Sequence, residues 1–161
     1  MQKKKFNGFN DEGCLPFGVY EMTLDEFEEI FSKDKSLRRQ EIMKYYKEHI
    51  KQITSSPYYL NHWIDGSYVT SKENPNDIDT VTEFDGVKID QNDDKPLIED
   101  LIYNAPLRTY NTCHSFMVYK YPKSYQEEYE DYLELKSMTL IMIFGRNKET
   151  KNPKGIVKLK N

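Results

Sequence analysis

Two aspartates, Asp77 and Asp79, have the residue type and spacing that most clearly indicate chemistry in this sequence. If residues 78–84 form a strand, an Asp-x-Asp pair places both carboxylates on one face of the pleat, about 6–7 Å apart along the backbone. Two carboxylates in that arrangement suit a divalent cation. Nine residues separate Ser67 from Asp77, which is enough for a loop that folds the Gly66-Ser67 turn back over whatever the metal holds.

Several elements must position these residues. Thr23 and Glu26 form a capping box that predicts a helix to about residue 31, and Ser36 caps a longer helix to about residue 53. The apolar stripe of the longer helix suits packing against a sheet. Residues 60–65 predict a short strand that leads into Gly66, and residues 78–84 predict the aspartate strand.

The second half of the chain continues the alternation of helices and strands. Residues 86–95 are acidic and rich in turn formers, so a loop beside the site is expected, followed by a short helix over 96–103 and a strand over 115–121. A second capping box, at Ser124 and Glu127, predicts a long helix to residue 144 that Gly145 ends. Residues 155–160 alternate in polarity and predict an edge strand.

These elements predict an α/β (α+β) fold in which a small mixed sheet is flanked by the two long helices. The length of 161 residues predicts one domain over residues 1–161. Residues 1–22 are expected to form an irregular N-terminal arm, because glycine and proline recur along them.

Composition and charge exclude several classes of protein. The net charge is −4 and the charges are interspersed, so no DNA partner is evident, although a local basic groove is compatible with this sequence. The mean hydropathy of −0.84 and the lack of an apolar leader predict a cytoplasmic protein without a membrane span. Cys14 and Cys113 lack paired ligand spacing, which favours reduced, partly buried thiols.

The Gly66-Ser67 turn followed by Asp77-Ile78-Asp79 resembles the motif of the nucleotidyltransferase superfamily, which has the polymerase-beta-like fold. The resemblance extends to a group of small, largely uncharacterised bacterial and phage nucleotidyltransferase-like proteins. The additional segments that carry it are Gly13–Tyr20, Arg38-Arg39 and Pro153–Val157.

The resemblance implies roles for the residues of the motif. Gly66 and Ser67 would hold an NTP triphosphate through backbone N–H groups and the serine hydroxyl, and Asp77 and Asp79 would bind Mg²⁺ or Mn²⁺. Lys72, in the loop between the two parts of the motif, is a candidate triphosphate contact, with a solvated loop lysine as the alternative.

One position departs from the superfamily pattern. His114 stands where the resemblance implies a third carboxylate, which would also be the general base for the acceptor hydroxyl. Three explanations are open: His114 substitutes for the carboxylate, an acid such as Asp90 or Asp94 moves in, or the site binds nucleotide and does little chemistry.

Two further positions allow alternative interpretations. Arg38 and Arg39 could hold a phosphate or an RNA backbone, or they could pair with acids such as Asp34 or Glu41. Asp65 is expected to satisfy the backbone of the Gly66 turn rather than to bind metal.

The resulting hypothesis is a minimal metal-dependent nucleotidyltransferase that transfers an NMP from an NTP to a hydroxyl of protein or RNA. The resemblance also implies a role in a toxin–antitoxin or phage-defence module, with a protein partner such as an antitoxin. The alternatives are a catalytically weak or inactive nucleotide-binding or partner-binding module of the same fold, and a structural subunit without nucleotide affinity.

Overall fold

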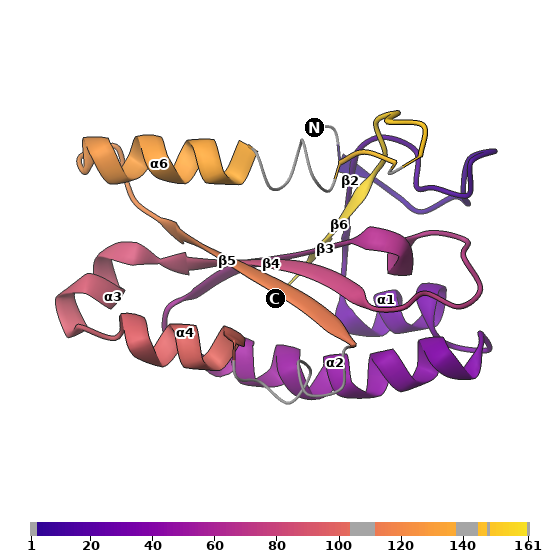
Figure 1. Ribbon diagram of the computed structural model, residues 1–161, viewed down its shortest axis with the longest axis horizontal. Coiled ribbons are helices and arrows are strands. Elements are labelled where there is room, and N and C mark those ends of the chain that lie inside the picture. The colour runs from indigo at the N-terminus through magenta and orange to yellow at the C-terminus, as the bar shows by residue number, and fades with distance from the viewer. Residues whose placement is uncertain (1–2, 104–111, 138–144, 148, 161) are drawn as a thin grey trace.

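The computed structural model describes residues 3–103, 112–137, 145–147 and 149–160. Six strands form one mixed sheet in the order β1-β2-β6-β3-β4-β5 (Figure 1). The strands are β1 (Lys3–Lys4), β2 (Val19–Met22), β3 (Tyr59–Asp65), β4 (Ile78–Asp85), β5 (Cys113–Lys120) and β6 (Ile156–Leu159). β3 is antiparallel to both of its neighbours, whereas the other neighbouring strands are parallel. The predicted α/β fold with a mixed sheet is therefore confirmed.

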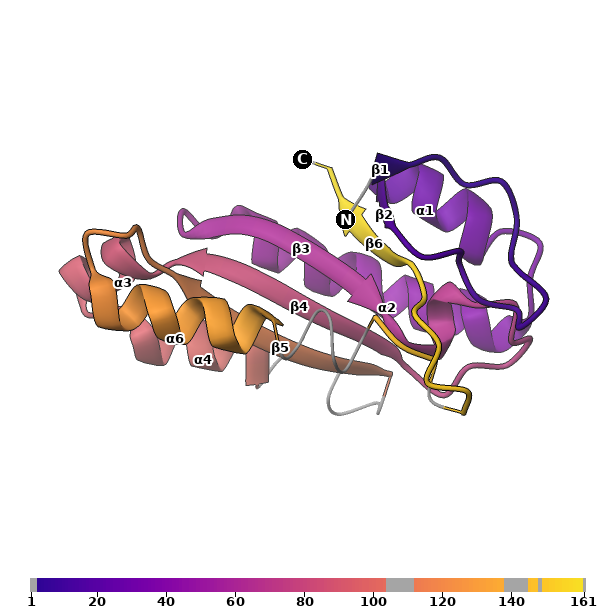
Figure 2. The same ribbon diagram turned by 90° about the horizontal axis from the view of Figure 1, so that it is seen from above.

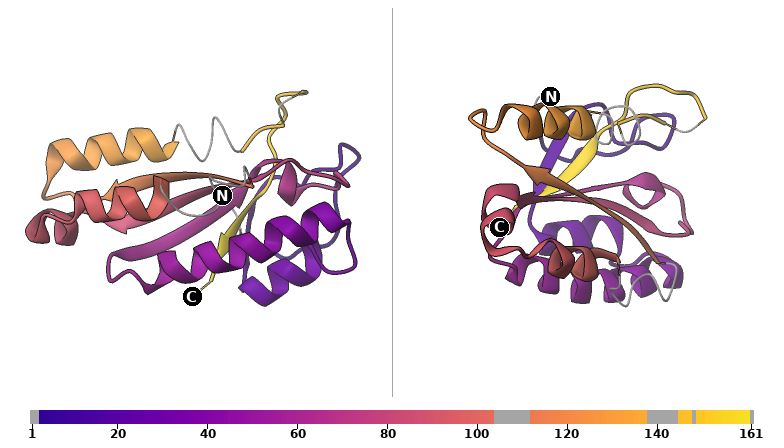
Figure 3. Two further views of the ribbon diagram at one scale, coloured as in Figure 1. Left: turned by 60° about the horizontal axis from the view of Figure 1, so that its bottom comes forward. Right: turned by 60° about the vertical axis from the view of Figure 1, so that its left-hand side comes forward.

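Helices cover both faces of the sheet. α1 (Leu24–Phe31), α2 (Leu37–Ser55) and α4 (Lys95–Tyr103) lie on one face, and α6 (Gln126–Ser137) lies on the other (Figures 1 and 2). α3 (Gly86–Asn92) follows β4 directly at the end of the sheet where that strand finishes. The additional views show the same layers, with α1 and α2 side by side under the sheet (Figure 3).

Local sequence signals account for where the first two helices begin. Thr23 and Glu26 make the predicted capping box of α1, and the side chain of Ser36 accepts a hydrogen bond from the backbone N–H of Arg39 at the start of α2. α2 then buries one face against the sheet, with Ile42, Tyr46 and Ile53 fully covered. Burying each such side chain contributes about 1.5–3 kcal/mol, so α2 anchors the main core.

The acidic segment after the aspartate strand is a helix rather than the predicted loop. Asp85 accepts a hydrogen bond from the backbone N–H of Lys88 and so caps α3, while Ile89 is buried. The prediction that this segment lies beside the site was also wrong. α3 follows the last residue of β4, whereas Asp79 is near the first, so the two lie at opposite ends of the strand.

Two predictions about the chain ends also need correction. β6 is an internal strand, paired with β2 on one side and β3 on the other, and is not an edge strand. Residues 1–22 are not wholly irregular, because they contribute β1 and β2 to the same sheet. Alternating polarity describes the faces of a strand, but it does not reveal how many neighbours the strand has.

The predicted continuation of α6 over 138–144 lies outside the described residues. Among the residues that the structure describes, no helix combines the length and the apolar character needed to span a membrane. Cys14 and Cys113 are both free and buried, as predicted.

Candidate metal centre

Three neighbouring strands bring the candidate metal ligands to one end of the sheet. Asp79, the second residue of β4, is in register with His114 on β5 and with Asp65 on β3. Asp77 immediately precedes β4. The relative positions of Asp79 and His114 are therefore set by the backbone ladder of a parallel strand pair, which is more rigid than a loop.

The side chains of Asp77, Asp79 and His114 converge. His114 Nδ1 lies 3.2 Å from Asp77 Oδ2 and 3.4 Å from Asp79 Oδ1. One ligand atom from each residue falls within 4.8 Å of the other two. The exposed fraction rises from 9 % for the Asp79 side chain to 21 % for Asp77 and 62 % for His114. The group is therefore buried at Asp79 and open to solvent at His114.

This geometry fits a single divalent cation. Bonds of about 2.1 Å from oxygen and nitrogen ligands to one ion place neighbouring ligand atoms roughly 3.0–3.4 Å apart. The two measured separations, 3.2 and 3.4 Å, are in this range. The ligand atoms of the two aspartates lie within 4.8 Å of one another, so a shift of these side chains alone would bring all three ligands to one ion.

The Gly66-Ser67 turn lies against the metal group. A short 3₁₀ helix, η1 (Gly66–Val69), begins where β3 ends, and Gly66 has the left-handed φ of +76°. A Cβ atom at position 66 would overlap Asp79 Oδ2. Glycine is therefore needed both for the backbone conformation and for the close approach of the aspartate.

A cavity of about 510 Å³ adjoins this turn and the metal group. Gly66, Ser67, Lys72 and Asp79 line one side, together with the half-exposed ring of Phe116 from β5. A further part of the lining, the far wall, comes from the two ends of the chain and consists of Glu12, Gly13, Cys14, Arg146, Asn147 and Glu149. The predicted nucleotide-binding residues Gly66, Ser67 and Lys72 thus share one cavity.

Glu12 joins the two ends of the chain at the far wall. Its carboxylate accepts hydrogen bonds from Asn147 Nδ2 at 3.2 Å, Thr150 Oγ1 at 3.0 Å and Asn152 Nδ2 at 2.6 Å. The adjacent Gly13 accepts a backbone hydrogen bond from Ser71, which ties the N-terminal segment to the loop that follows η1. The wall that presents Arg146 to the cavity is therefore built from both ends of the chain.

Lys154 is a buried cation in the floor of the cavity. Its Nζ donates to Asp65 Oδ1 at 2.8 Å and to the carbonyl oxygen of Gly66 at 3.3 Å, and both side chains of the pair are less than a tenth exposed. Burial raises the pKa of Asp65 to about 7, although Lys154 acts in the opposite direction. Asp65 thus supports the turn, as expected, but its main partner is a lysine that sequence reasoning did not assign.

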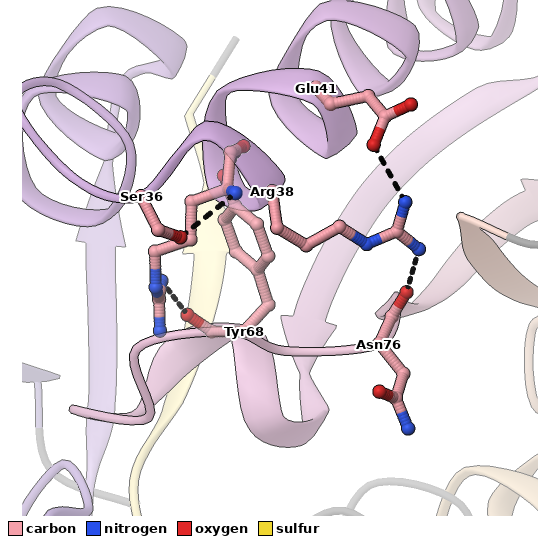
Figure 4. Close-up of polar contacts among 6 residues, drawn as sticks. Ser36, Arg38, Glu41, Tyr68 and Asn76 are labelled. Atoms are coloured by element: carbon pink, nitrogen blue, oxygen red, sulfur yellow. Dashed lines mark hydrogen bonds and ion pairs between the residues drawn. The ribbon is translucent and has the colours of Figure 1, made fainter.

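Arg38 and Arg39 hold the loop between η1 and β4 and are not among the residues that line the cavity. Arg38 donates to Glu41 at 2.8 Å and to the carbonyl of Asn76, as Figure 4 shows. The buried Arg39 guanidinium donates to backbone carbonyls only; its acceptors are Phe31, Tyr68, Thr70 and Lys72. The interpretation of a pairing role is therefore right for Arg38, and Arg39 also has a structural role.

Asp90 and Asp94 do not move into the site. Asp90 accepts from the hydroxyl of Tyr121 at 2.8 Å and pairs with Lys95 at 3.2 Å, and Asp94 accepts from the hydroxyl of Tyr58. Both lie beyond the far end of β4, in or next to α3. Of the three explanations for the missing carboxylate, substitution by His114 and weak catalysis remain.

The fold and site together define an α/β protein with a candidate metal-binding group of two aspartates and one histidine. The chain belongs to the Family of unknown function (DUF6932), whose model matches residues 7–160. No curated protein and no solved structure matches the chain.

Proposed function

We propose that this protein is a minimal metal-dependent nucleotidyltransferase that transfers an NMP from an NTP to a hydroxyl of protein or RNA. The observation that carries the proposal is the convergence of Asp77, Asp79 and His114 beside the Gly66-Ser67 turn, at the edge of a cavity with basic side chains. A divalent cation bound there would bridge phosphate oxygens and neutralise charge on the departing pyrophosphate.

The residues around the cavity have distinct roles in this proposal. The backbone N–H groups and hydroxyl of the Gly66-Ser67 turn hold phosphate oxygens, and Lys72 and Arg146, which both line the cavity, offset the charge of the triphosphate. Lys154 adds a buried positive charge beneath the turn while it remains paired with Asp65. Glu12 and Glu149 also line the cavity, and Glu12 is engaged by hydrogen bonds from Asn147, Thr150 and Asn152.

Phe116 is the candidate platform for the nucleobase. It lies two residues after His114 on β5, so both side chains point to the same face of the strand, and 45 % of Phe116 is exposed beside the cavity. An aromatic ring stacks on any base. A site that uses Phe116 in this way would bind all four NTPs with similar affinity.

A second candidate function is a nucleotide-binding module that performs little chemistry. One observation favours it: the third member of the metal group is an imidazole in the place where the superfamily resemblance implies a carboxylate. If His114 ligates metal, it is not available as the base for the acceptor hydroxyl. Such a module would act through a protein partner, for which an antitoxin is the candidate.

Calorimetry with each NTP, in the presence of Mg²⁺ or Mn²⁺, tests the proposed site. The native chain should bind in a metal-dependent manner, and the Asp77→Asn, Asp79→Asn double variant should not. The matched control is the Asp90→Asn, Asp94→Asn double variant, which makes the same chemical change at the opposite end of β4. Equal NTP binding by the native chain and the Asp77, Asp79 variant would refute the site.

Incubation with α-³²P-labelled NTP then separates the two candidate functions. Label that becomes covalently attached to protein or RNA, and that requires Asp77 and Asp79, indicates nucleotidyl transfer. Metal-dependent binding with no label transfer to any protein or RNA of a bacterial extract would favour the binding module.

A further inference from the structure

His114 is the member of the metal group that contributes nitrogen, and its position is built into the sheet. Its Cα is directly opposite that of Asp79 in the β4–β5 ladder, and its Nδ1 faces both carboxylates. The ring is largely exposed, so little packing opposes its reorientation away from the acids. The two contacts, at 3.2 and 3.4 Å, hold Nδ1 where it could share a cation with both carboxylates.

Divalent cations differ in their affinity for a mixed set of oxygen and nitrogen ligands. Mg²⁺ is a hard ion that takes oxygen ligands and retains several waters, whereas first-row transition ions accept imidazole readily. Mn²⁺ binds carboxylate and phosphate oxygens as Mg²⁺ does, and as a first-row transition ion it also accepts an imidazole nitrogen, although more weakly than the later ions of that series. A centre of two carboxylates and one imidazole beside a phosphate cavity matches that combination.

We propose that this centre is selective for Mn²⁺ over Mg²⁺, and that His114 is the residue that determines the selectivity. The inference rests on the proposed function only in requiring that the Asp77, Asp79 and His114 group binds a metal. It goes further by naming the ion and the side chain that chooses it.

Metal affinity measured without nucleotide tests the inference directly. Calorimetric titration of the native chain should give a dissociation constant for Mn²⁺ at least about tenfold lower than for Mg²⁺, the size of effect that one ligand or its support produces. His114→Asp should reduce this ratio to about threefold or less, because an oxygen ligand replaces nitrogen. His114→Asn should weaken Mn²⁺ binding while leaving Mg²⁺ binding nearly unchanged.

A spectroscopic measurement identifies the ligand without reference to activity. Electron spin echo spectra of the Mn²⁺-loaded protein should show modulation from a directly bound imidazole nitrogen, and His114→Asn should remove it. The other two histidines, His49 and His62, are buried in the core and so do not supply this signal. Thermal melts of each variant check folding, which substitution of a side chain that is 62 % exposed should preserve.

The outcomes distinguish this inference from the proposed function. Binding of Mn²⁺ and Mg²⁺ with similar affinity, without nitrogen modulation, would overturn the inference and leave the proposed nucleotidyl transfer standing. Absence of binding for both ions without nucleotide would overturn the inference, and absence of metal-dependent NTP binding as well would overturn the proposed function. Selective Mn²⁺ binding with nitrogen modulation that His114→Asn removes would support the inference, even in a protein that transfers no nucleotide.

Discussion

Gly66 lies so close to Asp79 that a methyl group on residue 66 would occupy the position of the aspartate carboxylate oxygen. The Gly66-Ser67 turn and the candidate metal ligand Asp79 are thus in direct contact, and a change in one must displace the other. Ser67 and Asp79 line the same cavity, so in the proposed function their separation determines whether a phosphate held by the turn can reach the metal.

Gly66→Ala should therefore impair both stability and metal binding. A left-handed conformation costs a residue with a side chain about 1–2 kcal/mol, and the overlap with Asp79 adds to that cost. Gly8→Ala is the matched control, because Gly8 has a φ of +97° and no atom within 4 Å of the added carbon. Urea unfolding and Mn²⁺ titration should show the larger loss for Gly66→Ala; equal losses would mean that the contact with Asp79 is unimportant.

Phe116→Ala should weaken the binding of every NTP by roughly 5- to 150-fold, because stacking contributes about 1–3 kcal/mol per base. Binding of inorganic triphosphate should not change, since it has no base. Phe17→Ala is the control, because Phe17 is 48 % exposed and does not line the cavity. Equal effects on NTP and triphosphate, measured by calorimetry, would rule out the stacking role.

Arg39→Lys should destabilise the protein by about 2 kcal/mol or more and loosen the loop over residues 70–73. A lysine ammonium cannot replace the guanidinium, which donates to carbonyls of α1, η1 and the loop at once. Arg38→Lys, at a more exposed pairing site, should change the free energy of unfolding by less than about 1 kcal/mol. Hydrogen exchange should show faster amide exchange over 70–73, next to the carbonyls that Arg39 binds, in Arg39→Lys and not in Arg38→Lys, whose loop contact is at Asn76; unchanged exchange would contradict the role assigned to Arg39.

Lys154→Met should lower the free energy of unfolding much more at alkaline than at acidic pH. Burial already raises the pKa of Asp65 to about 7, and removal of the lysine takes away the attraction that limits this rise. The folded state then holds a proton that the unfolded state has released, so stability falls as pH increases from about 4 upward through the folded pKa.

Breaking this buried pair should cost about 3–5 kcal/mol near pH 8 and less near pH 5, where Asp65 is protonated. The Asp65→Asn, Lys154→Met double variant should recover part of the loss, because no buried charge remains. Urea unfolding at the two pH values provides the comparison. A loss for Lys154→Met that is independent of pH would show that Asp65 is not the group left uncompensated.

His49 and His62 should make the protein less stable in acid. Burial lowers the pKa of His49 to about 4 and that of His62 to about 3, so below pH 6.5 the unfolded state binds protons that the folded state does not. Each histidine should reduce the free energy of unfolding by on the order of 1–2 kcal/mol between pH 7 and pH 5.

The His49→Gln, His62→Asn double variant isolates this effect. The two amides can replace the ring nitrogens that contact Ser115 and Thr82. The raised pKa of Asp65 makes its contribution to stability increase as pH falls through the same range. The difference between native protein and variant is therefore more informative than the pH dependence of native stability alone. If the double variant loses as much unfolding free energy between pH 7 and pH 5 as the native protein, His49 and His62 are not the cause of the loss.

Much of the metal group could be predicted from the sequence because its determinants are local. The capping box at Thr23, the strand before Gly66 and the Asp-x-Asp spacing each depend on residues a few positions apart. The register of β5 against β4 then brings His114 to Asp79, as the resemblance to nucleotidyltransferases implied.

The floor and the far wall of the cavity could not be predicted, because their contacts join distant parts of the chain. Lys154 and Asp65 are 89 positions apart, and Glu12 and Asn152 are 140 positions apart. The Pro153–Val157 segment contributed to the family resemblance, but nothing in its composition indicates a buried lysine beneath the phosphate turn. The position of α3 was missed for a related reason, since an acidic segment gives no information about which end of the sheet it occupies.

The insertion of β6 between β2 and β3 has a consequence for synthesis of the chain. β1 and β2 form one part of the sheet, β3 to β5 form the other, and β6 pairs with both. The two parts can form one continuous sheet only after residues 156–159 have emerged from the ribosome, and Lys154, which lies beneath Gly66, emerges just before them. A chain that stops before Lys154 would carry the complete Asp-x-Asp motif and His114, but its sheet would be divided and the Gly66 turn would lack the lysine beneath it.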